Sequence, residues 1–242
     1  MKRILICLLV LIYQESFSQS IQYEAELGIN ASGKPYKETY GRGDGKGSSL
    51  FSPLLGFSLT TNHWKRFSLT AGIQFYTSGK KYRFHGEGTY MTVNYSQTET
   101  EKMAFTQLSF PVHLNYNFNV GKLEMYTFLG YAFSNYIKGS YEYLHELTFS
   151  QDIGRDLYIE KSFDPFSKDL KTPAKRTTDL ISIGVGMKVH QRIGIQARFS
   201  TALQQLYFEE YPTQGSIPDN PNDHHYFSRS DVTLSVKYLL NK

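Results

Sequence analysis

The chain has 242 residues, with 26 lysines and arginines against 22 aspartates and glutamates, and one cysteine, Cys7. A formal net charge of +4 is too small to indicate a nucleic-acid partner, and a single cysteine excludes a disulfide framework. Aromatic residues make up 15% of the chain, a usage that favours strands. The length fits one all-β domain.

The first residues read MKRILICLLVLIYQESFSQS. Lys2 and Arg3 precede an apolar run over 4–13, and the small residues Ser16 and Ser18 then stand before a plausible cleavage point. This order predicts a secretory signal peptide over 1–18 and a domain over 19–242. The apolar run is about half of what a membrane helix needs. No later apolar run approaches that length, so any spanning structure must be built from strands.

Eight segments alternate apolar and polar side chains, and a period of two predicts β-strands. In chain order they cover residues 21–30, 51–61, 67–75, 107–118, 123–138, 177–190, 193–208 and 230–242. The fourth, QLSFPVHLNYNF, is long for a strand of a soluble protein. It also contains Pro111, which cannot donate to a sheet ladder, so we expect a bulge or an inserted side chain beside it.

Short and long connections alternate strictly along the chain. The short ones fall near 62–66, 119–122 and 190–192, and the long ones near 31–50, 81–101, 139–176 and 209–228. In a closed meander this places every short turn at one end, as in outer-membrane barrels. The predicted fold is therefore all-β: an eight-stranded antiparallel up-and-down transmembrane β-barrel with short periplasmic turns and long extracellular loops.

A soluble lipocalin-like barrel also has eight alternating strands and is the alternative fold. Its polar faces would meet water and carry many lysines and glutamates, whereas the polar faces here hold mainly amides and small residues. Aromatic residues near the segment ends also fit the two girdles of a membrane barrel. These are Tyr23, Trp64, Phe67, Tyr116, Phe118, Tyr207 and Tyr238.

The fourth segment carries a family pattern. Leu108-Ser109-Phe110-Pro111-Val112 and then Asn115-Tyr116-Asn117-Phe118 are similar to the middle strand of the PorT-family outer-membrane β-barrels of Bacteroidetes, with Leu108, Pro111, Tyr116 and Phe118 as the marks. Segments that look like other strands of that family are Phe128-Leu129-Gly130-Tyr131, Asp179-Leu180 with Gly184-Val185-Gly186, and Val236-Lys237-Tyr238. Ser109 stands where the family often has Glu, and the chain ends Leu-Leu-Asn-Lys instead of at an aromatic residue. The resemblance implies an outer-membrane barrel and, from the founding member's tie to type IX secretion, an accessory role in an envelope or secretion complex.

Charged residues on the polar faces would point into the lumen if the apolar faces meet lipid. Strands seven, eight and one become neighbours on closure, so we expect Arg198, Lys237 and Glu26 at comparable heights in a buried ionic cluster. The interior of an eight-stranded barrel is only just wide enough for side chains, so such a cluster would plug it. The predicted structural cluster comprises Glu24, Glu26, Glu124, Lys188, Arg198 and Lys237.

No constellation typical of catalysis, of a cofactor or of a metal site is readable. His113 is the one histidine clearly inside a strand, and the pair His224-His225 after Asp223 has no further ligands at metal-site spacing. Arg42-Gly43-Asp44, the tripeptide that integrins read, stands in a glycine-rich loop where chance explains it. We expect no catalytic residues, no metal and no cofactor.

The expected function is a non-enzymatic structural or surface-interaction barrel, monomeric and in contact with outer-membrane lipid. Loops 31–50 and 139–176 are the candidate contacts for a protein partner, because long loops on a rigid scaffold commonly carry binding. The alternatives are a barrel enzyme that hydrolyses lipid or peptide, and the soluble binding barrel.

Overall fold

The part of the chain described by the computed structural model comprises residues 21–33, 36–40, 43–64, 66–90, 93–150, 157–168, 170, 173–209, 224–227 and 229–240. The predicted signal peptide lies outside these residues. The described part is built from strands: β1 (Ile21–Ser32), β2 (Tyr36–Tyr40), β3 (Gly43–Trp64), β4 (Phe67–Tyr90), β5 (Val93–Val120), β6 (Leu123–Phe149), β7 (Leu157–Phe163), β8 (Thr177–His190), β9 (Ile193–Ala202), β10 (Leu206–Glu209), β11 (His224–Phe227) and β12 (Ser230–Leu239).

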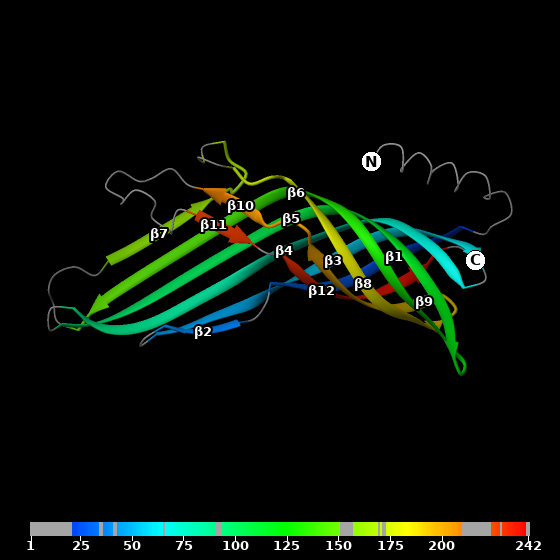
Figure 1. The fold of residues 1–242 in the computed structure, drawn as a ribbon, viewed down its shortest axis with the longest axis horizontal. Coiled ribbons are helices and arrows are strands. Elements are labelled where there is room, and N and C mark those ends of the chain that lie inside the picture. Colours follow the sequence, from blue (N-terminus) through cyan, green and yellow to red (C-terminus); the bar gives the residue numbers. More distant parts are fainter. Residues whose placement is uncertain are drawn as a thin grey trace.

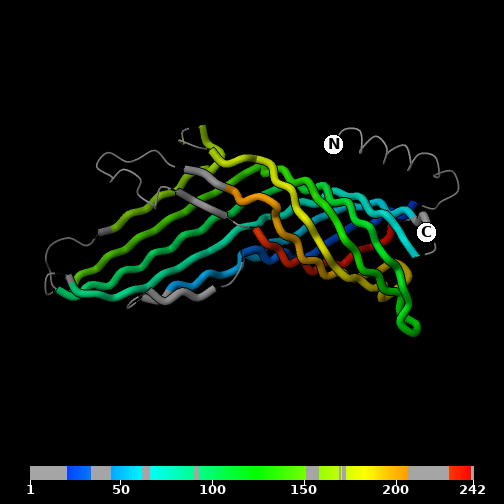
Figure 2. Tube along the Cα trace, viewed as in Figure 1, coloured from blue at the N-terminus to red at the C-terminus, as the bar shows by residue number. Residues whose placement is uncertain are grey.

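Eight of these strands close into a ring. The order is β1-β12-β9-β8-β6-β5-β4-β3, every pairing is antiparallel, and β3 pairs with β1 to complete the circle. Figures 1 and 2 show the tilted ring at the end of the molecule where the described C-terminal strand lies. Three shorter pieces lie off the ring, because β2 pairs with β3, β7 pairs with β6, and β10 pairs with β11. The predicted eight-stranded antiparallel barrel is confirmed.

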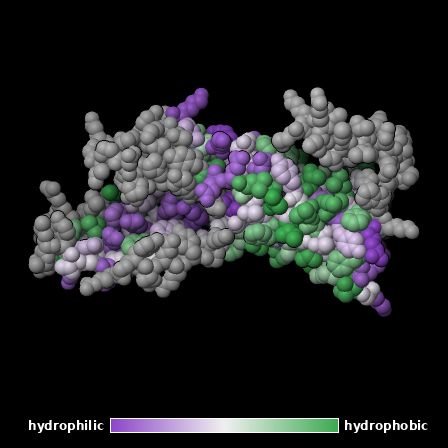
Figure 3. Space-filling model, in the orientation of Figure 1, coloured by the Kyte–Doolittle hydropathy of each residue, from purple (hydrophilic) through white to green (hydrophobic). Residues whose placement is uncertain are grey.

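The barrel is apolar outside and polar inside. Leu27, Leu129 and Leu234 are 60–63% exposed, whereas Asn30 and Gln107 are fully buried. Hydrophobic side chains gather over the barrel half of the molecule in Figure 3. A water-soluble barrel would bury its large apolar side chains, so the soluble lipocalin-like alternative is wrong and the outer surface is the face that meets lipid.

Four neighbouring strands are far longer than the membrane requires. β3, β4, β5 and β6 have 22, 24, 28 and 27 residues, whereas β9 and β12 have 10 each, and about 9–11 tilted residues cross a bilayer. The surplus continues as a sheet beyond the barrel, flanked by β2 and β7 (Figure 1).

The long connections predicted over 31–50 and 81–101 are therefore largely strand, and that over 139–176 is strand at 139–149 and 157–163. The 81–101 loop is a continuation of β4 and β5 as far as Tyr90 and Val93. Neither face of these extensions meets the hydrocarbon core of the bilayer, so their strands lack the strict apolar alternation that marks the barrel segments. The stretch 144–149 belongs to β6, and β7 pairs with β6.

Aromatic residues line the short-turn end of the barrel. The Phe67 and Tyr116 rings lie 5.3 Å apart, and Tyr116 also stacks near Phe118 at 6.1 Å. Arg66 donates a hydrogen bond of 3.1 Å to the Tyr116 hydroxyl, and Arg192 donates one of 3.4 Å to that of Tyr238. Amphipathic rings held by arginines suit a membrane interface. The side chains of Trp64 and Tyr207 lie outside the described part.

Pro111 faces the lumen in β5 but has no bulge beside it. In the ladder with β4, Ala71 pairs with Val112 and Gln74 with Ser109, which leaves Pro111 unpaired on that side while the register stays unchanged. The register shift between β5 and β6 lies higher, at Thr106 and Gln107, and its extra residue is Ile137 of β6. The missing proline donor is accommodated by a gap in the ladder, so of the two features expected beside Pro111 the bulge is wrong.

Gly130 of β6 provides the space for a lumen side chain. A methyl group on Gly130 would stand 2.2 Å from His113 Cδ2 and 2.6 Å from Ser182 Oγ. We expect Gly130→Ala to lower the free energy of unfolding by about 1–3 kcal/mol, because the filled interior must shift. Urea unfolding of the detergent-refolded barrel measures this. Gly194→Ala is the matched control, since the nearest atom to its added methyl lies at 3.4 Å; equal losses in both variants would contradict the account.

Candidate functional site

The lower lumen holds a network of charged side chains, which we name the lower cluster: Glu24, Glu26, Gln74, Arg198 and Lys237. Lys237 Nζ forms an ion pair with Glu24 Oε2 at 3.0 Å. Glu26 accepts hydrogen bonds from Gln74 Nε2 at 2.7 Å and from Ser235 Oγ at 2.6 Å. Arg198 donates to Gln74 Oε1 at 2.7 Å, so Gln74 bridges the arginine and the glutamate. Four of the six residues expected in an ionic cluster thus lie in one network.

The expectation for Glu124 and Lys188 needs correction. They form an ion pair of 2.8 Å with each other, and their side chains are 61% and 52% exposed. Glu124 is the second residue of β6 and Lys188 lies near the end of β8, so both stand at the short-turn rim. They stand at the mouth of the lumen, where Lys188 lines a hollow together with Glu24 and Lys237, and are not part of the buried network.

A second network closes the upper lumen and was not expected from the sequence. We name it the upper cluster: Tyr76, Gln107, Arg229 and Asp231. Arg229 donates from Nε to Asp231 Oδ2 at 2.6 Å, from Nη1 to Gln107 Oε1 at 2.5 Å, and from Nη2 to the Tyr76 hydroxyl. All four side chains are almost completely buried. Since the two clusters lie one above the other, the lumen is filled by side chains rather than open.

Above the barrel, the extended strands carry a hydrophobic core of their own. We name β3, β4, β5 and β6 beyond the barrel, with β2 and β7, the extracellular sheet. Residues 164–168 pack on its inner face, where the Phe166 ring lies 5.9 Å from Phe105 and 5.8 Å from Tyr136. The members of this core are Met103, Phe105, Tyr136, Tyr141, Phe166, Leu170, Ala174 and Leu206. Part of the aromatic content of 139–176 thus stabilises the sheet.

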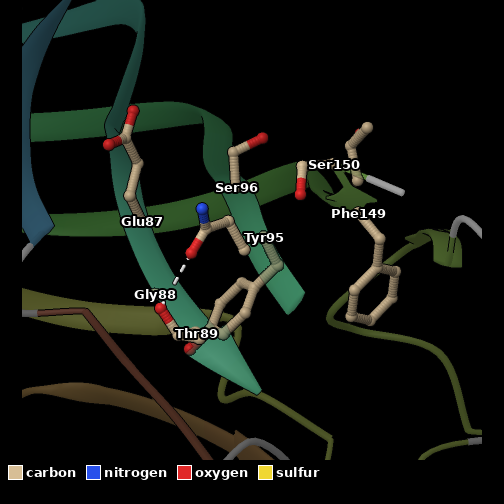
Figure 4. Close-up of a pocket in the computed structure, with 9 residues that line it drawn as sticks. Glu87, Gly88, Thr89, Tyr95, Ser96, Phe149 and Ser150 are labelled. Carbon is tan, nitrogen blue, oxygen red and sulfur yellow. Dashed lines mark hydrogen bonds between the residues drawn. The ribbon is translucent and has the colours of Figure 1, made fainter. Parts of the chain in front are cut away.

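An open pocket lies where the β4–β5 hairpin meets the end of β6 (Figure 4). Its volume is about 430 Å³. The Tyr95 and Phe149 rings lie 6.3 Å apart, and Thr89 Oγ1 donates to Asn94 Oδ1 at 2.9 Å. Two rings beside hydroxyl, amide and carboxylate groups form a mixed surface of the kind that small-ligand sites use. The lining residues are Glu87, Gly88, Thr89, Asn94, Tyr95, Ser96, Thr148, Phe149 and Ser150.

The inner face below this pocket carries charged side chains of both signs, including Glu99 and Glu101. Glu99 Oε1 lies 3.9 Å from His145 Nε2. Burial, followed by the charges of Glu99 and Glu101, raises the pKa of the Tyr143 hydroxyl to about 12. Tyr143 therefore stays protonated in any physiological medium.

The histidines do not assemble an evident catalytic site. His113 is buried in the lumen, with its ring 4.6 Å from that of Phe128. On the outer face of the extracellular sheet, His85 Nδ1 lies 3.1 Å from Thr98 Oγ1 and its Nε2 lies 3.9 Å from Glu87 Oε1. Thr98, His85 and Glu87 are thus arranged like the nucleophile, base and orienting group of a hydrolase. The side chains of His85 and Glu87, however, are 57% and 75% exposed. The residues paired around it belong to a continuous strand ladder, which leaves few free amides for an oxyanion hole.

Several residues singled out from the sequence fall at the margin of the described part. Arg42 and Asp223 lie outside it, and the side chains of Asp44, His224 and His225 are not described. Within the described residues no group of three His, Cys, Asp or Glu is placed to hold a metal. None of the described residues forms a helix long and apolar enough to cross a membrane.

The closed ring, the lipid-facing exterior and the filled interior define an integral β-barrel of the bacterial outer membrane. A family model described as "Outer membrane protein beta-barrel domain" matches residues 14–207. The chain belongs to this family. No curated protein matches it.

Solved structures of outer-membrane proteins are similar to the chain at low sequence identity. Ail of Yersinia pestis, solved with the heparin analogue sucrose octasulfate, is 12% identical, with 91% of this chain and 99% of Ail covered at a TM-score of 0.38. OprG of Pseudomonas aeruginosa is 8% identical, with 93% and 98% covered at 0.42. The protease OmpT of Escherichia coli is 9% identical, with 93% and 99% covered at 0.34.

Proposed function

We propose that this barrel is a non-enzymatic surface-interaction protein whose working part is the extracellular sheet. The observation that carries the proposal is the length of β4, β5 and β6, which continue well beyond the bilayer requirement and form a second hydrophobic core there. A barrel that served only as a membrane anchor would not need this rigid extension.

The filled lumen supports the same proposal. Arg198 and Arg229 are buried in separate networks across the interior, and an eight-stranded barrel leaves little room beside such side chains. Conduction through the lumen is therefore disfavoured, and binding is left to the surface. The arrangement of Thr98, His85 and Glu87 is exposed and has few free backbone amides around it, which argues against a hydrolase.

The partner we propose is a protein of the cell envelope or of the outside medium, bound through the extracellular sheet by a monomeric barrel. The resemblance to PorT-family barrels of Bacteroidetes favours an accessory role in an envelope or secretion complex. No cofactor enters this role.

Site-specific photo-crosslinking in living cells tests the proposal. A photoreactive residue at Tyr95 or Phe149 is expected to yield discrete protein adducts, whereas Leu234, 60% exposed on the barrel wall, should yield lipid adducts. In a trimmed variant, the dipeptide Asn-Gly replaces the chain between Arg83 and Thr100, which are direct partners in the β4–β5 ladder. This deletes the distal part of the hairpin and closes it with a two-residue turn. The Phe149 adduct should disappear in the trimmed background. Lipid adducts alone at both sheet positions would overturn the proposal.

A further inference from the structure

A group of basic side chains stands on the outer face of the extracellular sheet. The group comprises Lys46 of β3, Lys81 and Arg83 of β4, and Lys102 of β5, and we name it the basic patch. Lys46 is directly opposite Arg83, and Lys81 is directly opposite Lys102. Like charges at directly opposed positions destabilise a sheet. An external anion would relieve the repulsion within these two adjoining rows.

Carboxylates on this face neutralise little of that charge. Lys102 forms an ion pair of 3.0 Å with Glu142. Among the side chains that the structure describes, no ion pair is found for Lys46, Lys81 or Arg83, all of which are exposed. The neighbouring Lys80 points to the opposite face, where it pairs with Glu101 at 3.2 Å. The basic patch thus keeps an excess of about three positive charges on directly opposed and adjoining positions of β3, β4 and β5.

The position of the patch indicates what neutralises it. Lys81 follows Phe75 by six residues on the same face of β4, and Phe75 is 44% exposed on the lipid-facing wall. That separation is about 20 Å along the strand and about 15 Å in height for a tilted strand. Long basic side chains can bend back toward the interface. The patch therefore lies over the headgroup layer, on the side of the barrel that lipid surrounds.

We propose that the basic patch binds the phosphate groups of a lipid in the outer leaflet. The acyl chains of such a lipid would pack on the apolar wall below, where Phe51 and Phe75 are 71% and 44% exposed. Arg83 has the planar fork that holds phosphate oxygens in pairs, and the lysines add point charges. The site holds one flank of the extracellular sheet to the membrane and leaves its inner face to a partner.

Native mass spectrometry of the full chain in detergent, titrated with diphosphoryl lipid A, tests the proposal. Each basic residue near an anionic surface contributes about fivefold in affinity, so Lys81→Gln with Arg83→Gln is expected to weaken binding about thirtyfold. The matched control is Lys122→Gln with Arg192→Gln, which removes the same charge from exposed turns at the opposite end and should leave binding unchanged. The swap Lys81→Arg with Arg83→Lys keeps the charge and should retain most of the affinity.

Lipid A freed of its phosphates is the second arm and should bind the unaltered protein as weakly as diphosphoryl lipid A binds the neutral variant. Heat-modifiable gel migration checks that each variant is folded. Equal affinity for the two lipids, or equal losses in the neutral variant and its control, would overturn the proposal. Stronger binding of a soluble polyanion such as heparin than of the phosphorylated lipid would overturn it as well.

Discussion

Replacing Arg229 by alanine is expected to lower the free energy of unfolding by about 3–5 kcal/mol, because it leaves the carboxylate of Asp231 buried without its partner. Arg229 and Asp231 are each only 1% exposed. Removing the guanidinium also takes hydrogen-bond donors from Gln107 and Tyr76. Urea unfolding of the refolded barrel in detergent measures the loss.

The double variant Arg229→Ala with Asp231→Ala should recover part of that loss, since no unpaired charge remains. Arg192→Ala, an exposed arginine in the β8–β9 turn, is the matched control and should change stability by no more than about 0.5 kcal/mol. A loss at Arg229 as small as that at Arg192 would show that the upper cluster is not formed.

The second large effect is expected in the lower cluster. Arg198→Ala should cost about 3–5 kcal/mol of unfolding free energy and lower the melting temperature markedly, because Glu26 is then left buried without a nearby cation from β9. Adding Glu26→Ala should restore part of the stability. A double-mutant cycle built on urea unfolding measures the coupling between the two side chains.

The structure makes this coupling depend on Gln74, which accepts from Arg198 and donates to Glu26. Repeating the cycle in a Gln74→Ala background should therefore shrink the coupling energy. Strictly additive losses in the original cycle would refute the pairing, and an undiminished coupling without Gln74 would refute the bridge.

The barrel was readable from the sequence because one face of each segment meets lipid. Leu108, Phe110, Val112 and Leu114 alternate with polar residues throughout the membrane, and this alternation ends where the lipid ends. Residues 81–101 look like a loop because both faces of their strands are outside the bilayer. Their strand character comes from pairing with neighbouring extensions, which no local pattern reveals.

The lower cluster was partly readable for a related reason. Glu26, Arg198 and Lys237 lie on strands that become neighbours on closure, and a count from the short turns placed them at similar heights. The bridge through Gln74 was missed, because it depends on the shear that brings β4 across from β9. Arg229 was missed because it stands just before the last alternating segment. Its spacing of two from Asp231 was the one signal that both side chains share a face.

Labelling of single cysteines with a membrane-impermeant maleimide tests most directly how the barrel is oriented in the membrane and whether its lumen is filled. Cys7 is the sole cysteine and lies in the predicted signal peptide, so each variant adds one thiol. Ser96→Cys lies near the tip of the extracellular sheet, Lys122→Cys in the β5–β6 turn, and Ser182→Cys in the lumen, where the serine is 3% exposed.

We expect labelling at position 96 on intact cells, labelling at position 122 only after the outer membrane is permeabilised, and no labelling at position 182 in either state. Labelling at position 182 of the folded protein would contradict the filled lumen. Labelling at position 122 on intact cells would reverse the orientation and remove the sheet from the cell surface.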